Sequence, residues 1–320
     1  MLIKKEKVFS VSLIVLLSVF IVLGSGIISN SVQAQSGSHE GIKVGITFMT
    51  TDNEFFQAME NSVREEIEGK LNGTLLVSNG QHDAAKQLND VEDFLIQGIE
   101  LLLLNPVDYE ASESVVALAK EAGVPVICLD GDSIGDRDIF IASNNYDAGV
   151  IDAEYVAERL EGEGKVVVIN GNPVSAVRNR FNGFMDTIKK YPDIEVVAEQ
   201  NGDGVKTKSL TVMSNILQGQ PEIDAVFAIN DPSALGVLAA VQSAGREDEM
   251  FIVGVDGAPN ALEAISNGTA LEATAAQQPA KIGKLGVEYG LKILNGEETP
   301  DEIPVPVKLI TEDNAADFSW

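Results

Sequence analysis

Leu101-Leu102-Leu103-Leu104-Asn105 and Val126-Ile127-Cys128-Leu129-Asp130 are two apolar runs that each end on one polar residue. The second half of the chain repeats this pattern in the same order, with Ala225-Val226-Phe227-Ala228-Ile229-Asn230 and Phe251-Ile252-Val253-Gly254-Val255-Asp256. In each half the Asn and the Asp lie about 25 positions apart, which suits one strand, a helical crossover and the next parallel strand. The sequence therefore predicts a parallel α/β arrangement that is built twice.

The four strand-end residues, Asn105, Asp130, Asn230 and Asp256, are candidates for ligand binding. Ligands of open parallel α/β sheets bind outside the carboxyl ends of the strands. Two sheets that each present an amide and a carboxylate there indicate one ligand held between two lobes. The alternative is that Asn and Asp are simply common turn residues after a strand. Repetition in the same order favours the ligand-binding interpretation.

Strand and helix patterns alternate through the rest of the chain, as in sheets covered by helices on both faces. Strands are predicted at 42–48, 74–78, 101–104, 125–129, 139–142, 165–170, 194–199, 224–229, 251–255 and 270–274, and helices at 54–69, 83–97, 110–122, 145–160, 175–190, 205–218, 232–244, 259–267 and 279–294. The predicted fold is α/β, with two similar doubly wound parallel-sheet lobes joined by a three-segment hinge.

The hinge is expected at short extended crossings near Ser143-Asn144, Gln277-Gln278 and Pro306-Val307, because no low-complexity linker separates the halves. These crossings divide the chain into an N-terminal lobe, 35–143 plus 278–306, and a C-terminal lobe, 144–277 plus 307–320.

The first 34 residues resemble a secretory signal peptide. Lys4, Lys5 and Lys7 precede an apolar run from Val8 to Leu23, and Val32-Gln33-Ala34 resembles a signal-peptidase site. The run is short for a membrane span, so cleavage after Ala34 is favoured over an uncleaved anchor, which stays open as the alternative. Since no Cys lies near the site, a lipid anchor is not expected. We expect export, to the periplasm or to the outer face of the cytoplasmic membrane.

The composition excludes several classes of partner and chemistry. Forty-nine acidic residues face 22 basic ones, for a formal net charge of −27. Such a surface repels DNA, RNA and anionic membranes and disfavours phosphorylated ligands, so no nucleic-acid partner is expected. Cys128 is the only cysteine, and it lies inside an apolar run, as a small core residue would. His39 and His82 have neither metal-ligand spacing nor a neighbouring nucleophile, and no hydrolase elbow or complete phosphate-binding loop is present. We therefore expect no enzyme activity, no metal and no cofactor.

Residue chemistry at the candidate site suits a hydroxyl-rich ligand. The carboxylates of Asp130 and Asp256 can each accept two hydroxyl hydrogen bonds, and amides both donate and accept, as hydroxyls do. Phe55 and Phe56 follow the first predicted strand, where a ring can pack on the C–H face of a sugar, although either ring can instead be a core residue. Arg178 or Arg180 could donate to the ligand, and a surface ion pair is an equal alternative for each.

Several segments along the chain resemble the exported sugar-binding proteins of ABC transporters, closest to the ribose-binding type. The likeness runs through nearly all of the mature chain, in Asn53-Glu54-Phe55-Phe56, Leu104-Asn105-Pro106-Val107-Asp108, Pro125-Val126-Ile127-Cys128-Leu129-Asp130, Ile141-Ala142-Ser143-Asn144-Asn145, Arg178-Asn179-Arg180-Phe181-Asn182-Gly183-Phe184, Phe227-Ala228-Ile229-Asn230-Asp231, Val253-Gly254-Val255-Asp256-Gly257 and Ala276-Gln277-Gln278-Pro279. Each segment is a weak signal alone, but together, in order and at family spacing, they are specific.

The resemblance implies a type I periplasmic binding protein that closes on a neutral monosaccharide (pentose or hexose) and delivers it to a membrane permease. It also implies a monomer. The family positions that contact sugar match Asn53, Phe55, Phe56, Asn105, Asp130, Ser143, Arg178, Asn230, Asp256 and Gln277. Gly131 stands where ribose binders typically carry an Arg, and Gly204 near where they tend to place an aromatic ring, so the resemblance does not specify ribose. A sensor that presents a sugar-like signal molecule to a membrane receptor is the alternative function.

Overall fold

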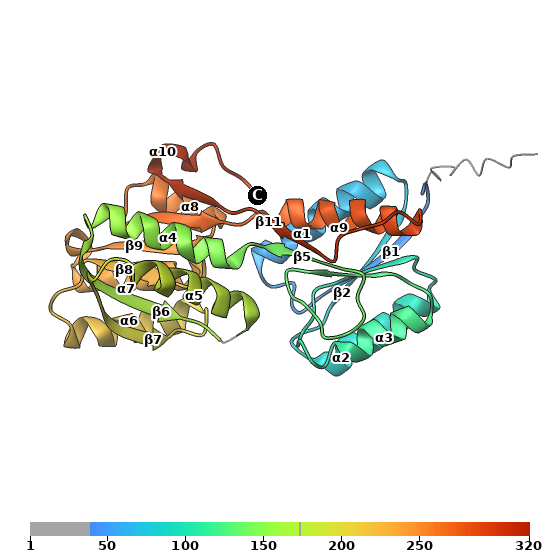
Figure 1. Ribbon diagram of the computed structural model, residues 1–320, viewed down its shortest axis with the longest axis horizontal. Helices are drawn as coiled ribbons and strands as arrows, with labels where there is room; N and C mark the ends of the chain where they lie inside the picture. The colour runs from blue at the N-terminus through green and yellow to red at the C-terminus, as the bar shows by residue number, and fades with distance from the viewer. Residues whose placement is uncertain (1–38, 173) are drawn as a thin grey trace, which may run out of the picture. The chain divides into compact units, whose positions relative to one another are not determined.

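The computed structural model describes residues 39–172 and 174–320, in which two six-stranded sheets form two lobes (Figure 1). The predicted signal peptide, residues 1–34, lies outside the described residues. Among the described helices, none has the length and apolar character that crossing a bilayer requires.

The sheet of the first lobe has the strand order β11-β5-β4-β3-β1-β2, and all of its pairs are parallel. Its strands are β1 (Lys43–Phe48), β2 (Thr74–Asn79), β3 (Leu101–Leu104), β4 (Val126–Leu129), β5 (Ile139–Ser143) and β11 (Glu302–Val305). Helices α1 (Glu54–Arg64), which continues as a π-helical turn (Glu65–Lys70), and α9 (Pro279–Leu294) cover one face, and α2 (Ala84–Ile96) and α3 (Glu113–Glu121) cover the other (Figure 1). Because both faces are covered, β3 and β4 are buried at every position.

The sheet of the second lobe has the order β12-β10-β9-β8-β6-β7. Its strands are β6 (Glu163–Asn170), β7 (Asp193–Asn201), β8 (Ala225–Ala228), β9 (Phe251–Asp256), β10 (Leu271–Ala276) and β12 (Lys308–Thr311). Helices α4 (Asn145–Arg159) and α5 (Ser175–Ile188) pack on one face, and α6 (Lys206–Gly219), α7 (Asp231–Ala244) and α8 (Pro259–Ser266) pack on the other. A 3₁₀ turn (Glu247–Glu249) precedes β9, and the short α10 (Glu312–Ala315) follows β12.

The chain passes between the two sheets three times, from β5 to α4, from β10 to α9 and from β11 to β12. The predicted fold of two doubly wound lobes with a three-segment hinge is thus confirmed. The prediction did not include β11 and β12, and β12 pairs antiparallel with β10, so the second sheet is mixed rather than fully parallel. Both strands have four residues and lie at sheet edges, and β11 contains Pro304, which an edge strand tolerates. Such short segments carry too little periodicity to be recognised in the sequence.

Candidate ligand-binding site

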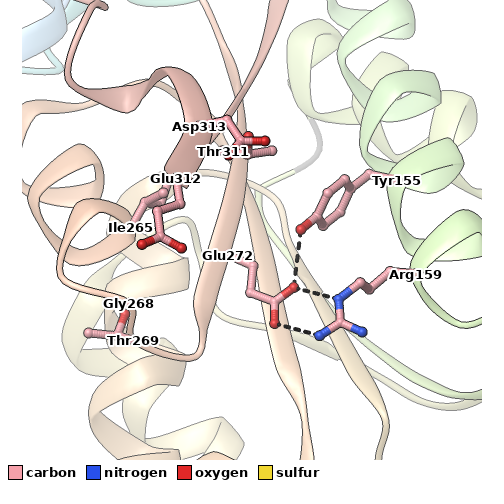
Figure 2. Close-up of a pocket in the computed structure, with 9 residues that line it drawn as sticks. All are labelled: Tyr155, Arg159, Ile265, Gly268, Thr269, Glu272, Thr311, Glu312 and Asp313. Atoms are coloured by element: carbon pink, nitrogen blue, oxygen red, sulfur yellow. Dashed lines mark hydrogen bonds and ion pairs between the residues drawn. The ribbon is translucent and has the colours of Figure 1, made fainter.

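A cavity of about 430 Å³ lies in the second lobe, at the edge of the sheet opposite to the carboxyl ends of its parallel strands (Figure 2). Glu272, near the start of β10, accepts a hydrogen bond from the Tyr155 hydroxyl at 3.1 Å and pairs with Arg159 through two contacts of 3.1 and 3.3 Å. These polar groups already satisfy one another, and parallel sheets bind ligands at the other edge. The cavity is therefore not the candidate site.

Two carboxylates, Asp130 and Asp256, directly follow or end β4 and β9 at the carboxyl edge of their sheets. Both residues have a positive φ, 64° for Asp130 and 139° for Asp256, in the region that favours glycine. A side chain held in this conformation leaves the alternating pattern of its strand. Such strain persists only where the surroundings fix it, and it occurs often at binding sites.

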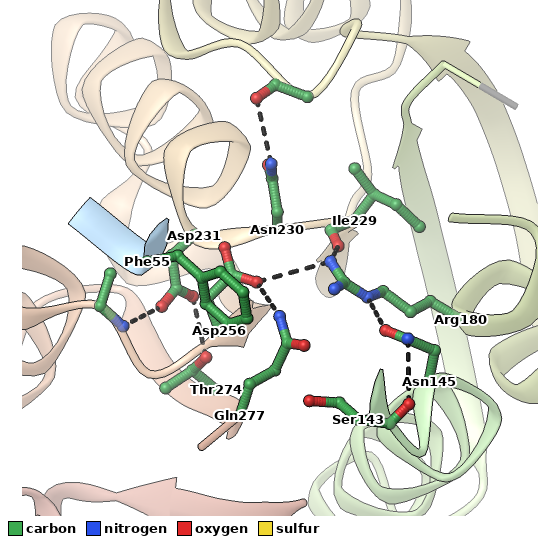
Figure 3. A network of polar contacts seen from close by, with 12 residues as sticks. Phe55, Ser143, Asn145, Arg180, Ile229, Asn230, Asp231, Asp256, Thr274 and Gln277 are labelled. Carbon is green, nitrogen blue, oxygen red and sulfur yellow. Dashed lines mark hydrogen bonds and ion pairs between the residues drawn. The ribbon is translucent and has the colours of Figure 1, made fainter. Parts of the chain in front are cut away.

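Asp256 is the centre of a polar network in the second lobe (Figure 3). Its Oδ1 accepts from Gln277 Nε2 at 2.7 Å and lies 3.5 Å from Arg180 Nη1. Arg180 also donates from Nε to Asn145 Oδ1 at 2.8 Å and from Nη1 to the Ile229 carbonyl at 3.1 Å. Arg180 is 7% exposed, so its guanidinium acts as a fixed cation inside the lobe.

Two further acids lie fully buried near this network. Asp231 accepts from the hydroxyl of Thr274 at 2.8 Å and from the backbone N–H of Ala258 at 2.7 Å. Burial raises the pKa of Asp231 well above its usual value, and the nearby charge of Asp256 adds to the effect. Burial likewise raises the pKa of Asp152 on α4, with a contribution from Asp231. A buried carboxyl of this kind holds its proton and avoids adding negative charge beneath the site.

The site carboxylates themselves titrate at unusual pH. Burial raises the pKa of Asp130 to about 6, Arg180 lowers it and Asp256 raises it. Burial also raises the pKa of Asp256, against the opposing effects of Arg180 and Gln277. Asp130 therefore experiences the charges of both Arg180 and Asp256, although it belongs to the other lobe. The two strand-end carboxylates therefore lie close enough for their charges to interact.

The strand-end asparagines have structural hydrogen bonds of their own. Asn105, 2% exposed, accepts from Met49 N at 3.1 Å and donates to the Leu129 carbonyl at 3.0 Å, so it ties the ends of three strands together. Asn230 caps α7 by accepting from Ser233 N at 3.0 Å and donates to the Gly204 carbonyl at 3.1 Å. A side-chain amide that accepts one hydrogen bond and donates one retains one N–H and one oxygen lone pair for a ligand. The turn interpretation thus describes part of what both residues do.

The other candidates lie at the same sheet edges. Asn53 is exposed and caps α1 by accepting from Phe55 N at 2.9 Å. Phe55 and Phe56 are 5% and 6% exposed and contact each other edge to face, so both rings belong to the core of the first lobe. Ser143 Oγ and Gln277 Oε1 are buried polar atoms for which the described part of the chain provides no hydrogen-bond partner. Because leaving such atoms unpaired is costly, they point to a polar ligand.

The cation at Asp256 is Arg180, whereas the sequence-based set contained Arg178. The side chain of Arg178 is exposed. Two positions along a helix differ by about 200° in direction, so only one of the two can face the lobe interior. Helical spacing was an available signal, because Arg180 shares the buried face of α5 with Gly183, Phe184 and Thr187.

Comparison with known proteins agrees with this architecture. Residues 44–298 match the family model described as the periplasmic binding protein domain. The ribose import binding protein of Bacillus subtilis (strain 168) is 37% identical over 281 residues, which cover 87% of this chain and 90% of the relative. The ribose import binding protein of Escherichia coli (strain K12) is 37% identical over 271 residues, covering 84% of this chain and 90% of the relative.

Solved structures give the same result. An ABC transporter periplasmic solute-binding protein from Actinobacillus succinogenes 130z with bound D-allose has a TM-score of 0.82 at 26% identity, covering 87% of this chain and all of that chain (100%). An ABC transporter solute-binding protein from Bacillus halodurans C-125 with bound myo-inositol has a TM-score of 0.80 at 27% identity, covering 88% of this chain and 98% of that chain. The chain belongs to the periplasmic binding protein family, a family of non-enzymatic solute-binding proteins similar to ribose import binding proteins.

Proposed function

We propose that this protein is an exported, monomeric solute-binding protein that binds a neutral monosaccharide (pentose or hexose) and delivers it to an ABC permease at the membrane. The observation that carries the proposal is the ion pair of the strand-end carboxylate Asp256 with the buried cation Arg180, together with the effect of both charges on the second strand-end carboxylate, Asp130. Carboxylates accept hydrogen bonds from hydroxyl groups, and the unpaired Ser143 and Gln277 oxygens add further polar contacts. Relatives named for ribose import, and neighbours with bound allose or inositol, support the ligand class.

The remaining members of the proposed contact set are Asn53, Phe55, Phe56, Asn105, Arg178, Asn230 and Gln277, and Arg180 is added to it because it lies beside Asp256. The sensor alternative has less support, because the relatives compared above are import proteins. Delivery predicts that cells lacking this protein lose uptake of its sugar at low concentration.

The charge balance of the site provides the test. Two carboxylates and one guanidinium leave about one net negative charge, and two like charges about 4 Å apart repel by about 4 kcal/mol at an effective dielectric constant of about 20. Calorimetry should therefore show that D-ribose, D-allose or a related neutral sugar binds, and that its phosphate binds at least about a hundredfold more weakly. The variant Asp130→Asn should narrow this difference. Tighter binding of the phosphorylated sugar would refute the proposal.

A further inference from the structure

The segment that follows α10 returns to the strand end that carries Asp256. Trp320, which is half-buried, donates from its indole N–H to the Asp256 carbonyl at 3.0 Å. Its ring meets Phe55 edge to face, with ring centroids 5.9 Å apart and an interplanar angle of 87°. Trp320 therefore contacts two residues of the proposed sugar site, one from each lobe, and it packs against the hydrophobic core of each lobe.

The same segment covers a strained turn. Asp256 has a φ of 139°, and Gly257 follows with a φ of 74°. A Cβ atom at Gly257 would lie 2.5 Å from Ala276 Cβ and 2.9 Å from Phe318 Cε1. Phe318 thus packs directly over the turn, and Trp320 binds its carbonyl. Strained conformations persist only where the surroundings over-determine them, so this segment helps to fix the direction of the Asp256 carboxylate.

The two aromatic residues of the proposed contact set, Phe55 and Phe56, both belong to the first lobe. In the second lobe, the loop at Gly204 carries no side chain, because its left-handed backbone (φ 72°) and the 3.2 Å separation from Asn230 Nδ2 to a Cβ there favour glycine. Aromatic pairs and indole N–H groups with an apolar body and a polar edge are well suited to line a sugar site.

We propose that Trp320 is a specificity-determining residue of the sugar site, which acts by positioning Phe55 and Asp256 relative to the ligand. The proposal rests on the proposed function. Trp320 couples the Phe55 ring of one lobe to the strand end that carries Asp256 in the other. Because Phe55 and Trp320 belong to different lobes, movement at the hinge changes the environment of the indole.

Trp320 is the only tryptophan in the sequence, so its fluorescence is a selective probe. We expect a saturating concentration of the best-binding neutral sugar to shift its emission and to reduce its quenching by acrylamide. Trp320→Ala should weaken binding about tenfold and alter the ratio of affinities among ribose, allose and inositol, because one aromatic contact and one hydrogen bond are lost. Trp320→Phe, which retains a ring but no donor, should have a smaller effect.

A matched control is Tyr191→Ala. Tyr191 is half-buried in the same lobe, but it precedes β7 and therefore lies at the edge opposite to the site. The Tyr191→Ala variant should lower the melting temperature as Trp320→Ala does, while leaving the ratios of affinity among the sugars unchanged. Unchanged affinity and ratios in Trp320→Ala, or in Trp320→Phe should the alanine variant not fold, would overturn the role of Trp320 alone. If no neutral sugar binds the wild-type protein, the proposed function fails first and this inference fails with it.

Discussion

Sugar binding should be linked to the release of a proton from Asp130. In the free protein, burial raises the pKa of this carboxyl from its usual 3.8 to about 6. Hydroxyl groups of a bound sugar donate to the charged carboxylate, which favours ionisation and lowers the pKa. If the pKa of Asp130 in the sugar complex returns to its usual value, the affinity for sugar at pH 5 should be about tenfold weaker than at pH 8. This difference corresponds to about 1.4 kcal/mol of binding free energy.

The assay is calorimetry at both pH values, in buffers that differ in ionisation enthalpy. At pH 5 about 0.8 proton should be released for each sugar bound, and at pH 8 almost none. Asp130→Asn, which cannot ionise, should bind more weakly and lose most of this proton release. Equal affinity at pH 5 and pH 8 without proton release would show that the ligand does not form hydrogen bonds with the Asp130 carboxylate.

The same proton affects the stability of the free protein in the opposite direction. A carboxyl whose pKa is raised by folding binds its proton more tightly in the native state than in the unfolded state. Stability from Asp130 is thus fully present below about pH 4 and is lost as the pH rises through about 6. Asp152 and Asp231, whose pKa values are also raised, act in the same sense. Without sugar, the melting temperature should therefore be higher at pH 5 than at pH 8, whereas affinity should be lower.

Three further results are expected. Arg180→Ala should cost about 2–5 kcal/mol of binding free energy by calorimetry, since it removes the cation that pairs with Asp256. Arg178→Ala should cost much less, and equal losses would contradict the assignment of Arg180 as the cation beside Asp256. Replacing Phe55 and Phe56 together by Ala should weaken sugar binding, and circular dichroism should show a folded but less stable protein, since both rings also belong to the core; undiminished affinity would exclude ring–sugar contact. Small-angle scattering should show a smaller radius of gyration with saturating sugar, because a ligand that contacts both lobes favours closure, and an unchanged profile would count against a hinge motion.

The sequence predicted the fold well because its signals are local and strong. Runs such as Leu101–Leu104 are buried on both faces and therefore apolar at every position, and each is separated from the next by one amphipathic helix. Even the hinge crossings could be placed, since Ser143 ends β5 and Gln277 directly follows β10, each just before a helix that starts the next part of the chain.

The site was harder to predict, because backbone hydrogen bonds and tertiary packing decide the role of each side chain. Asn105 and Asn230 follow strands as Asp130 does, yet their amides bind backbone groups of neighbouring segments. A contact such as Met49 N to Asn105 joins residues from different strands and leaves no pattern in the sequence. Trp320 is similar, because 64 residues separate it from Asp256, which it contacts.

Arg180 shows how close packing of two helices builds the site. A Cβ atom at Gly149 would lie 1.9 Å from the Arg180 carbonyl, and one at Gly183 would lie 2.1 Å from the Tyr146 carbonyl. Only glycine at both positions allows α4 and α5 to approach this closely. The approach brings Asn145 within 2.8 Å of Arg180 Nε and directs the guanidinium to the end of β9. These two glycines thereby place the cation that opposes the effect of burial on the pKa of Asp256.

The two lobes contribute to the site in different ways. In the second lobe, Asp256 is fixed by Arg180, Gln277 and Trp320, so its carboxylate is oriented before a sugar arrives. In the first lobe, Asp130 is held through its backbone N–H, which donates to the Ile141 carbonyl at 2.8 Å. Burial raises the pKa of its carboxyl to about 6. A preorganised group loses little entropy on binding, whereas a group that must release a proton and approach across a hinge completes the site only when the ligand is present. A sugar should therefore bind first to the second lobe, and the ionisation of Asp130 should follow as the first lobe joins it.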